Sequence, residues 1–271
     1  MNKILSGLIG FFLLPAVIIG TERMPWYGKS LEIEPRLTYL YQNFQDFKAG
    51  PHSLCYPSND HFIIASIGSS YDRYAVEYEF VVSSTRYLST GMDCQRLTGR
   101  TLILNDVTGD PISLTAGVTL TQASPGGVKD PGSFHHGRVE MEWHGALGKE
   151  WSCDSTWESR AWVVAGLGLA DSGSPWIRAD AAWENNYMDT HLLGIFVNTL
   201  WGLGGNSVHS LRRFDGYGPI HHQSVDWGIR YAYTFCGNYM LTLAYSRRVY
   251  AENFPLNANL CMATLYVPFG L

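Results

Sequence analysis

The chain has 271 residues, of which 46% are hydrophobic, 14% aromatic and only 16% charged, with a formal net charge of −5. The charged fraction lies below the roughly 25% of an average soluble domain. No segment carries a run of basic residues, which argues against a nucleic-acid partner.

The N-terminus predicts a secretory signal peptide over residues 1–20. Lys3 supplies the positive charge, an apolar run extends from Ile4 to Ile19, and Gly20 is the small residue before the cleavage point. A retained anchor is the alternative, but about 16 residues are few for a spanning helix. Beyond residue 20 no apolar run has the length of a spanning helix, so residues 21–271 are expected to form one exported domain that is not a helical membrane protein.

The chain contains an odd number of cysteines, namely Cys55, Cys94, Cys153, Cys236 and Cys261. An exported chain meets an oxidising compartment, so we expect one or two disulfides and a buried thiol. The sequence holds no C-x-x-C motif, and we expect neither a metal site nor a cofactor.

Strict alternation of apolar and polar residues dominates from residue 31 onward. In residues 225–235, Val225, Trp227 and Ile229 fall on one face of a strand, whereas Asp226 and Arg230 fall on the other. The pattern predicts about twelve strands of about 9–14 residues, which is the length of a tilted strand that crosses a bilayer. They are expected at 31–44, 60–68, 74–84, 97–105, 111–121, 134–147, 156–170, 175–186, 189–201, 223–235, 238–250 and 259–271.

The predicted connections alternate in length, as in membrane barrels with short periplasmic turns and long outer loops. The long ones are 45–59, 85–96, 122–133 and 202–222, and the tight ones are 69–73, 105–110, 187–188 and 236–238. Two connections depart from this rule: 171–174 is short for an outer loop, and 148–155 is long for a turn.

Alternation alone leaves two architectures open. A soluble sandwich or barrel buries the apolar face, whereas an outer-membrane barrel turns that face to lipid. Three observations favour the membrane barrel. Acids and arginines share the polar face in mid-strand, and 14 of the 19 basic residues are Arg, which suits pairing with carboxylates in a confined space. Small Gly, Ser and Thr residues separate them. Aromatic residues gather near strand ends, as in interfacial girdles; they are Trp143, Trp157, Trp176, Trp183, Trp201 and Trp227.

The C-terminus resembles the terminal targeting strand of the bacterial outer-membrane β-barrel proteins. Leu271, Phe269, Val267, Leu265 and Ala263 are apolar at alternate positions, although the last residue is not the usual Phe and Pro268 interrupts the strand. The resemblance implies an all-β fold: a single transmembrane antiparallel up-and-down β-barrel with a polar, charged lumen. It also implies residence in the outer membrane, contact with its lipid, and insertion by the barrel-assembly machinery through this strand.

Charged residues of the polar face are the candidate site. In a closed barrel they would line the lumen and set the field that a permeating solute meets. They are Arg36, Glu77, Glu79, Arg138, Glu140, Glu142, Arg160, Arg178, Asp180, Glu184, Asp226 and Arg230.

One short stretch of the sequence gives a weak indication of an enzyme. His222, Gln223 and Ser224 resemble part of the His-Gln-Ser-Asn-Gly stretch of outer-membrane phospholipases, but Val225 and Asp226 replace its Asn-Gly. Alternation also aims Ser224 into the lumen, away from lipid. The doublets His135–His136 and His221–His222 lack a carboxylate or Cys at ligand spacing.

The sequence therefore supports three hypotheses of function. The first is a narrow small-solute, porin-like channel. The alternative is a structural or surface-exposed adhesive barrel with a filled lumen, and the third is a lipid-modifying hydrolase. The chain is expected to be a non-enzyme, with no catalytic residue assigned.

Overall fold

The computed structural model describes residues 23–153, 156–235 and 239–270. The predicted signal peptide lies outside the described residues and stays a prediction. None of the helices in the described part of the chain is long and apolar enough to cross a bilayer.

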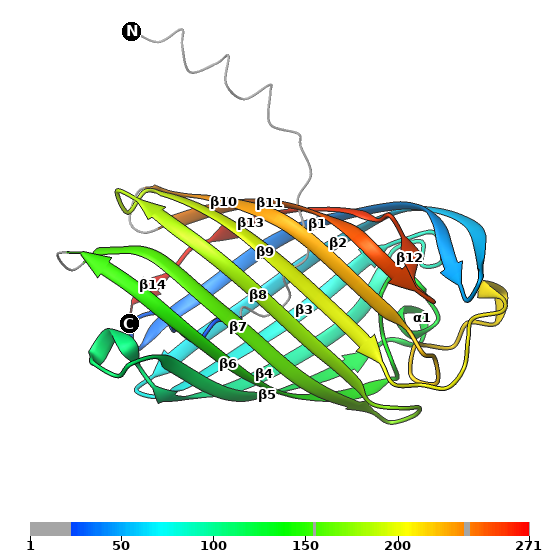
Figure 1. Cartoon of the computed structure of the whole chain (residues 1–271), viewed down its shortest axis with the longest axis horizontal. Helices are drawn as coiled ribbons and strands as arrows, with labels where there is room; N and C mark the ends of the chain where they lie inside the picture. The colour runs from blue at the N-terminus through cyan, green and yellow to red at the C-terminus, as the bar shows by residue number, and fades with distance from the viewer. Residues whose placement is uncertain (1–22, 154–155, 236–238, 271) are drawn as a thin grey trace, which may run out of the picture.

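Twelve antiparallel strands close into an up-and-down barrel, as predicted (Figure 1). Each strand pairs with its neighbours in sequence, and β13 closes the wall on β1 between Arg36↔Tyr266 and Asn43↔Asn259. Two-residue segments, β12 (Pro255–Leu256) and β14 (Phe269–Gly270), add to the edge of β1. The twelve strands are β1 (Glu32–Ala49), β2 (His52–Tyr71), β3 (Tyr74–Ser84), β4 (Gly91–Leu104), β5 (Ser113–Ala123), β6 (Val139–Cys153), β7 (Thr156–Ala170), β8 (Trp176–Tyr187), β9 (His191–Gly202), β10 (Gln223–Phe235), β11 (Tyr239–Glu252) and β13 (Asn259–Tyr266).

Several predicted loops are strand. The expected loop 45–59 is the tip of the β1–β2 hairpin, whose ladder continues past a bulge at Phe44/Asp46 to the pair Ala49↔His52. Gly50 makes the turn with a φ of +56°, which a glycine adopts without strain. Residues 148–153 and 91–96 are likewise strand. Conversely, 134–138 were predicted as strand but form a loop, because the chain there packs against the β9–β10 loop.

The apolar face of the strands is outside, as predicted for an outer-membrane barrel and opposite to a soluble one. On β3, Val76 is 55% exposed, whereas Glu77 and Glu79 are 4% and 3% exposed. Trp143, Trp183 and Trp227 are likewise exposed on the outer surface. The girdle prediction is wrong for Trp176, which is 2% exposed and faces the interior with Arg178, two residues along the same strand.

The end of the barrel opposite the C-terminus, hereafter the loop end, is filled by two loops (Figure 1). The β5–β6 loop (residues 124–138) contains α1 (Pro125–Val128), and the β9–β10 loop spans residues 203–222. The Tyr217 hydroxyl donates to the Pro131 carbonyl at 2.7 Å, and the Tyr217 N–H donates to the His135 carbonyl at 2.8 Å. Buried apolar side chains of the loops and of the barrel wall pack together in one cluster: Phe47, Ala49, Trp176, Leu200, Val208, Phe214, Tyr217, Ile220, Ala251 and Phe254.

Cys55, Cys94 and Cys261 are free thiols. Three free thiols leave two of the five cysteines for pairing, so the chain cannot form two internal disulfides. Of the one or two disulfides predicted, two is therefore wrong.

Candidate functional site: a charged lumen with an internal segment

The residues that precede β1 lie inside the barrel. The Arg23 guanidinium contacts the Glu142 carboxylate at 2.6 Å, and Arg100 donates to the Met24 carbonyl at 3.1 Å. Trp26 is 9% exposed, and its indole N–H donates to Asp106 at 3.0 Å. Residues 23–28, which we call the internal segment, are thus fixed to β4, to β6 and to the β4–β5 turn.

Glycine at position 148 makes room for this segment. A Cβ at Gly148 would lie 2.7 Å from both the Pro25 and the Trp26 rings, closer than real contacts allow. Arginine side chains cover the aromatic rings: Arg160 lies 4.8 Å from the Trp26 ring centroid, and Arg100 lies 4.9 Å from that of Tyr27. Cation–π contact adds to the hydrogen bonds that hold the segment in place.

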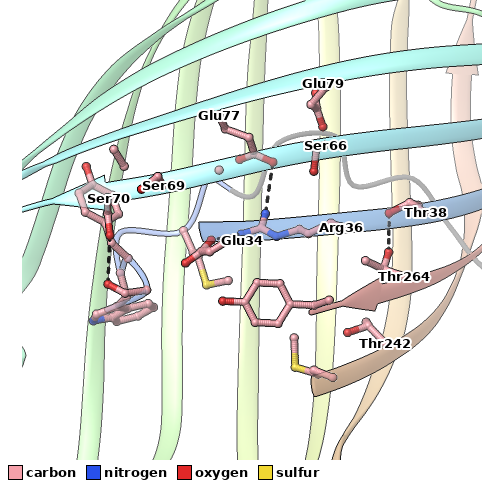
Figure 2. Close-up of a pocket in the computed structure, with 18 of the residues that line it drawn as sticks. Glu34, Arg36, Thr38, Ser66, Ser69, Ser70, Glu77, Glu79, Thr242 and Thr264 are labelled. Atoms are coloured by element: carbon pink, nitrogen blue, oxygen red, sulfur yellow. Dashed lines mark hydrogen bonds and ion pairs between the residues drawn. The ribbon is translucent and has the colours of Figure 1, made fainter. Parts of the chain in front are cut away.

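Ion pairs connect strands across the interior. Arg36 contacts Glu34 at 2.7 Å and Glu77 of β3 at 3.3 Å (Figure 2). Three further pairs also link strands: two join adjacent strands, and Arg230–Glu184 joins β10 to β8 on either side of β9. They are Arg160–Glu150 at 2.7 Å, Arg230–Glu184 at 3.1 Å and Arg248–Asp226 at 2.7 Å. In the enclosed space each charge is compensated by its partner, whereas an unpaired buried ion would cost free energy of desolvation.

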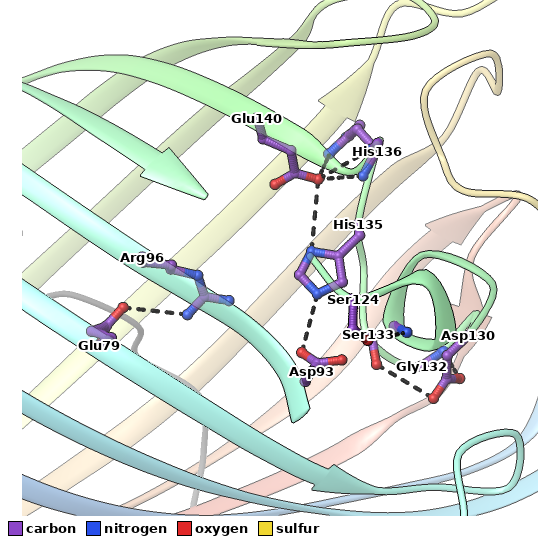
Figure 3. A network of polar contacts seen from close by, with 12 residues as sticks. Glu79, Asp93, Arg96, Ser124, Asp130, Gly132, Ser133, His135, His136 and Glu140 are labelled. Carbon is purple, nitrogen blue, oxygen red and sulfur yellow. Dashed lines mark hydrogen bonds and ion pairs between the residues drawn. The ribbon is translucent and has the colours of Figure 1, made fainter. Parts of the chain in front are cut away.

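A second polar network lies at the loop end, around His135 and His136 (Figure 3). His135 Nε2 is 3.1 Å from Asp93 Oδ2, and its Nδ1 is 3.7 Å from Glu140 Oε1. Burial opposes the charged imidazole, but the Asp93 carboxylate outweighs burial and raises the pKa of His135 well above its usual range. Burial lowers the pKa of both His136 and His222, whose Nε2 atoms lie 3.0 Å apart.

Eleven of the twelve predicted lumen residues line one of three interior cavities. Arg138 does not: its side chain is exposed, and it belongs to the β5–β6 loop because β6 begins one residue later. The eleven are Arg36, Glu77, Glu79, Glu140, Glu142, Arg160, Arg178, Asp180, Glu184, Asp226 and Arg230. Their role in lining a conducting pore stays a prediction.

Sequence reasoning missed four arginines that also reach the interior: Arg23, Arg96, Arg100 and Arg248. Every second residue of β11 from Thr242 through Ala244 and Ser246 faces inward, and Arg248 is the next, so alternation could have identified it. Arg96 was missed because the strand was expected to begin at residue 97. Arg23 has no signal in the pattern, since it precedes the first strand.

The three cavities meet at Arg230. One of about 210 Å³ lies nearer the C-terminus, one of about 200 Å³ lies at the loop end, and one of about 240 Å³ adjoins β9 and β10. Arg230 lines all three, is 6% exposed, and has Nε and Nη2 without hydrogen-bond partners among the described residues. Met24 of the internal segment lies between two of the cavities.

His222 and Ser224 do not form a lipid-facing hydrolytic pair. Both are buried inside the barrel, at 0% and 4% exposure, and His222 Nε2 pairs with His136. Phe254 and Tyr217 enclose the His222 ring at centroid distances of 5.4 and 5.0 Å. A lipid substrate would need access from the outer surface, which this position does not give.

A closed antiparallel barrel, apolar outside and filled with ion pairs inside, defines the class of the outer-membrane β-barrels, in contact with membrane lipid. No known family and no curated protein matches this sequence.

Solved structures share the fold. An outer membrane channel from Pseudomonas putida F1 aligns with a TM-score of 0.68 and 13% identity, over 93% of this chain and 100% of that one. The NanC porin aligns at 0.56 and 8% identity, over 85% and 98% of the two chains. The KdgM porin in complex with oligogalacturonate aligns at 0.50 and 8% identity, over 86% and 99%. The chain therefore has the twelve-stranded outer-membrane barrel fold.

Proposed function

We propose that the chain is a narrow channel for small solutes in the bacterial outer membrane. The observation that carries this proposal is the position of Arg230, where three polar cavities meet along the barrel interior. Two of its nitrogen atoms have no hydrogen-bond partner among the described residues. Both atoms are buried in this structure, so what a solute passing between the cavities would meet is the charge of the guanidinium.

The internal segment would regulate the width of this path. It occupies space that a solute would cross, and it is held by polar contacts at Arg23, Met24 and Trp26 and by packing of Trp26 in an apolar cluster. Polar contacts in a wetted lumen exchange readily with water, so the segment can move without unfolding the barrel. The structures named above as a channel and porins have the same fold, which supports the proposal without identifying a solute.

Planar bilayers test this function. The purified chain should give discrete conductance steps, and Arg230→Ala should change the ratio of anion to cation permeability, because it removes a charge at the meeting point of the cavities. Arg138→Ala, at the exposed rim, should leave that ratio unchanged. Silence of both the wild type and a variant that lacks residues 23–28 would instead support the filled structural barrel.

Export and assembly are part of the same proposal. We infer that residues 1–20 direct export and that the C-terminal strand is read by the barrel-assembly machinery. β13 ends at Tyr266, and after an interruption at Val267–Pro268 the pair Phe269–Gly270 resumes pairing with β1. Phe269 is 50% exposed on the outer surface, where a partner could contact it. Phe269→Ala should lower the yield of folded protein in outer membranes relative to Val139→Ala, a substitution of another exposed apolar residue.

A further inference from the structure

Three metal-ligating side chains that are distant in sequence meet at the loop end. Asp93 and Cys94 come from β4, and His135 comes from the β5–β6 loop. One ligand atom from each lies within 4.8 Å of the others. All three side chains are buried, with exposures of 2%, 0% and 2%.

A β-bulge explains how consecutive residues reach the same site. Neighbours on a regular strand point to opposite faces, so Asp93 and Cys94 should diverge. The ladder between β3 and β4 shifts at this point, where Val81 pairs with Cys94 and Val82 with Met92, which leaves Asp93 as the extra residue. Bulges re-aim side chains in this way and occur next to functional sites.

The hydrogen-bond pattern leaves ligand positions open. Asp93 Oδ2 contacts His135 Nε2 at 3.1 Å, but the buried Oδ1 has no hydrogen-bond partner among the described residues. Glu140 Oε1 lies 3.7 Å from His135 Nδ1, on the other side of the ring (Figure 3). In metal sites, a histidine that ligates through one nitrogen directs its other nitrogen at a carboxylate, as Glu140 would provide here.

We propose that Asp93, Cys94 and His135 bind a zinc ion. The donor set of one carboxylate oxygen, one thiolate sulfur and one imidazole nitrogen suits Zn²⁺, whereas Ca²⁺ and Mg²⁺ require oxygen ligands. Binding displaces the thiol proton of Cys94 and one ring proton of the His135 imidazolium to solvent. Asp93 and His135 line the cavity at the loop end, which gives the ion a route to the site, and solvent from that cavity would fill the fourth position. The ion would join the β5–β6 loop to the barrel wall.

A catalytic thiol is the alternative use of the same residues, since His135 is oriented by Asp93 as a base would be. Cys94 is fully buried and does not line the cavity, so a substrate could not reach its sulfur. The structure thus favours a ligand over a nucleophile.

Cobalt(II) is the probe that tests the site, because it replaces zinc and reports its ligands by absorption. The full-length protein, purified in detergent without a histidine tag, should bind one equivalent of Co²⁺ with tetrahedral visible bands and a thiolate charge-transfer band. Added Zn²⁺ should remove both. Cys94→Ser should abolish the charge-transfer band, and Glu140→Gln should weaken affinity by about 10–100-fold.

Two matched variants separate this site from other ligands. Cys55→Ser changes an exposed free thiol, and His222→Gln removes one member of the buried histidine pair. Both should keep the full spectrum. Absence of the bands in folded wild-type protein, or their persistence in Cys94→Ser, overturns the proposal. Binding lost equally in His222→Gln would also overturn it, since the ion would then lie at the histidine pair.

Discussion

Arg23 and Glu142 are 119 positions apart in the chain, yet their side chains lie 2.6 Å apart inside the barrel. Glu142 also accepts from the Trp176 indole at 3.0 Å and from Arg178 at 3.2 Å. The contact fastens the internal segment to a carboxylate that β8 already holds in place.

Substitution of Arg23 should release the internal segment. We expect Arg23→Ala to raise single-channel conductance several-fold, because the segment loses its charged contact with β6 while Arg178 still neutralises Glu142. The measurement is the step size in planar bilayers, compared with Arg138→Ala, whose side chain is exposed outside the lumen. Unchanged steps in Arg23→Ala would show that the segment does not limit conduction.

Docking of the β9–β10 loop should depend on Gly218. A Cβ there would lie 2.5 Å from the Ser172 carbonyl oxygen and 2.6 Å from that of His136, and both are backbone atoms that cannot rotate away. Gly218→Ala should therefore make the loop cleavable by added protease in folded barrels. Gly205→Ala lies in the same loop with open space around its Cβ, and it should stay as resistant as wild type. Equal resistance of the two variants would contradict this account.

The pair Arg248–Asp226 should contribute to stability as a unit. Arg248 is 2% exposed, and its Nε and Nη2 contact the two Asp226 oxygens at 2.7 and 2.9 Å. Arg248→Met should lower the free energy of unfolding by about 3–5 kcal/mol, because an unpaired carboxylate remains in the interior. Asp226→Asn combined with Arg248→Met should recover much of that loss. Urea titrations in lipid vesicles measure both, and additive effects would argue against coupling.

Asp130 should make the barrel more stable in mild acid. Burial, with Asp60 and Asp93 adding like charge, raises the pKa of Asp130 from 3.8 to about 6. A carboxyl whose pKa is raised on folding favours the folded state most below its unfolded pKa, and this contribution disappears as pH rises through the folded pKa. Between pH 4 and pH 7 we therefore expect a loss of up to about 3 kcal/mol, at roughly 1.4 kcal/mol for each pKa unit.

Asp130→Asn should flatten this profile, since the amide cannot ionise. The free energy of unfolding is followed against pH in the presence of EDTA, which keeps metal ions out of the comparison. Asp215→Asn, which alters an exposed carboxylate on the neighbouring loop, should retain the wild-type profile. The difference in unfolding free energy between wild type and Asp130→Asn isolates the Asp130 contribution, and a difference that rises from pH 4 to pH 7 would refute the expected sign.

The lumen could be predicted in outline because alternation is a local property. In residues 74–84, Tyr78 and Glu79 must point to opposite faces whatever the rest of the chain does. The prediction of which face is outside rested on composition, since the basic residues are mostly Arg, which suits pairing with carboxylates in a confined space. Most of the candidate lumen residues accordingly line interior cavities.

Alternation fixed the fold class, the approximate number of strands and the two faces of each strand. It could not place Arg138, because alternation sets the direction of a side chain only within a strand and β6 begins one residue later. Nor could it bring Arg23 to Glu142 or Cys94 to His135. Those contacts depend on barrel closure, on a bulge at Asp93 and on loops that fold inward, and each of these joins residues whose separation in sequence carries no periodic signal.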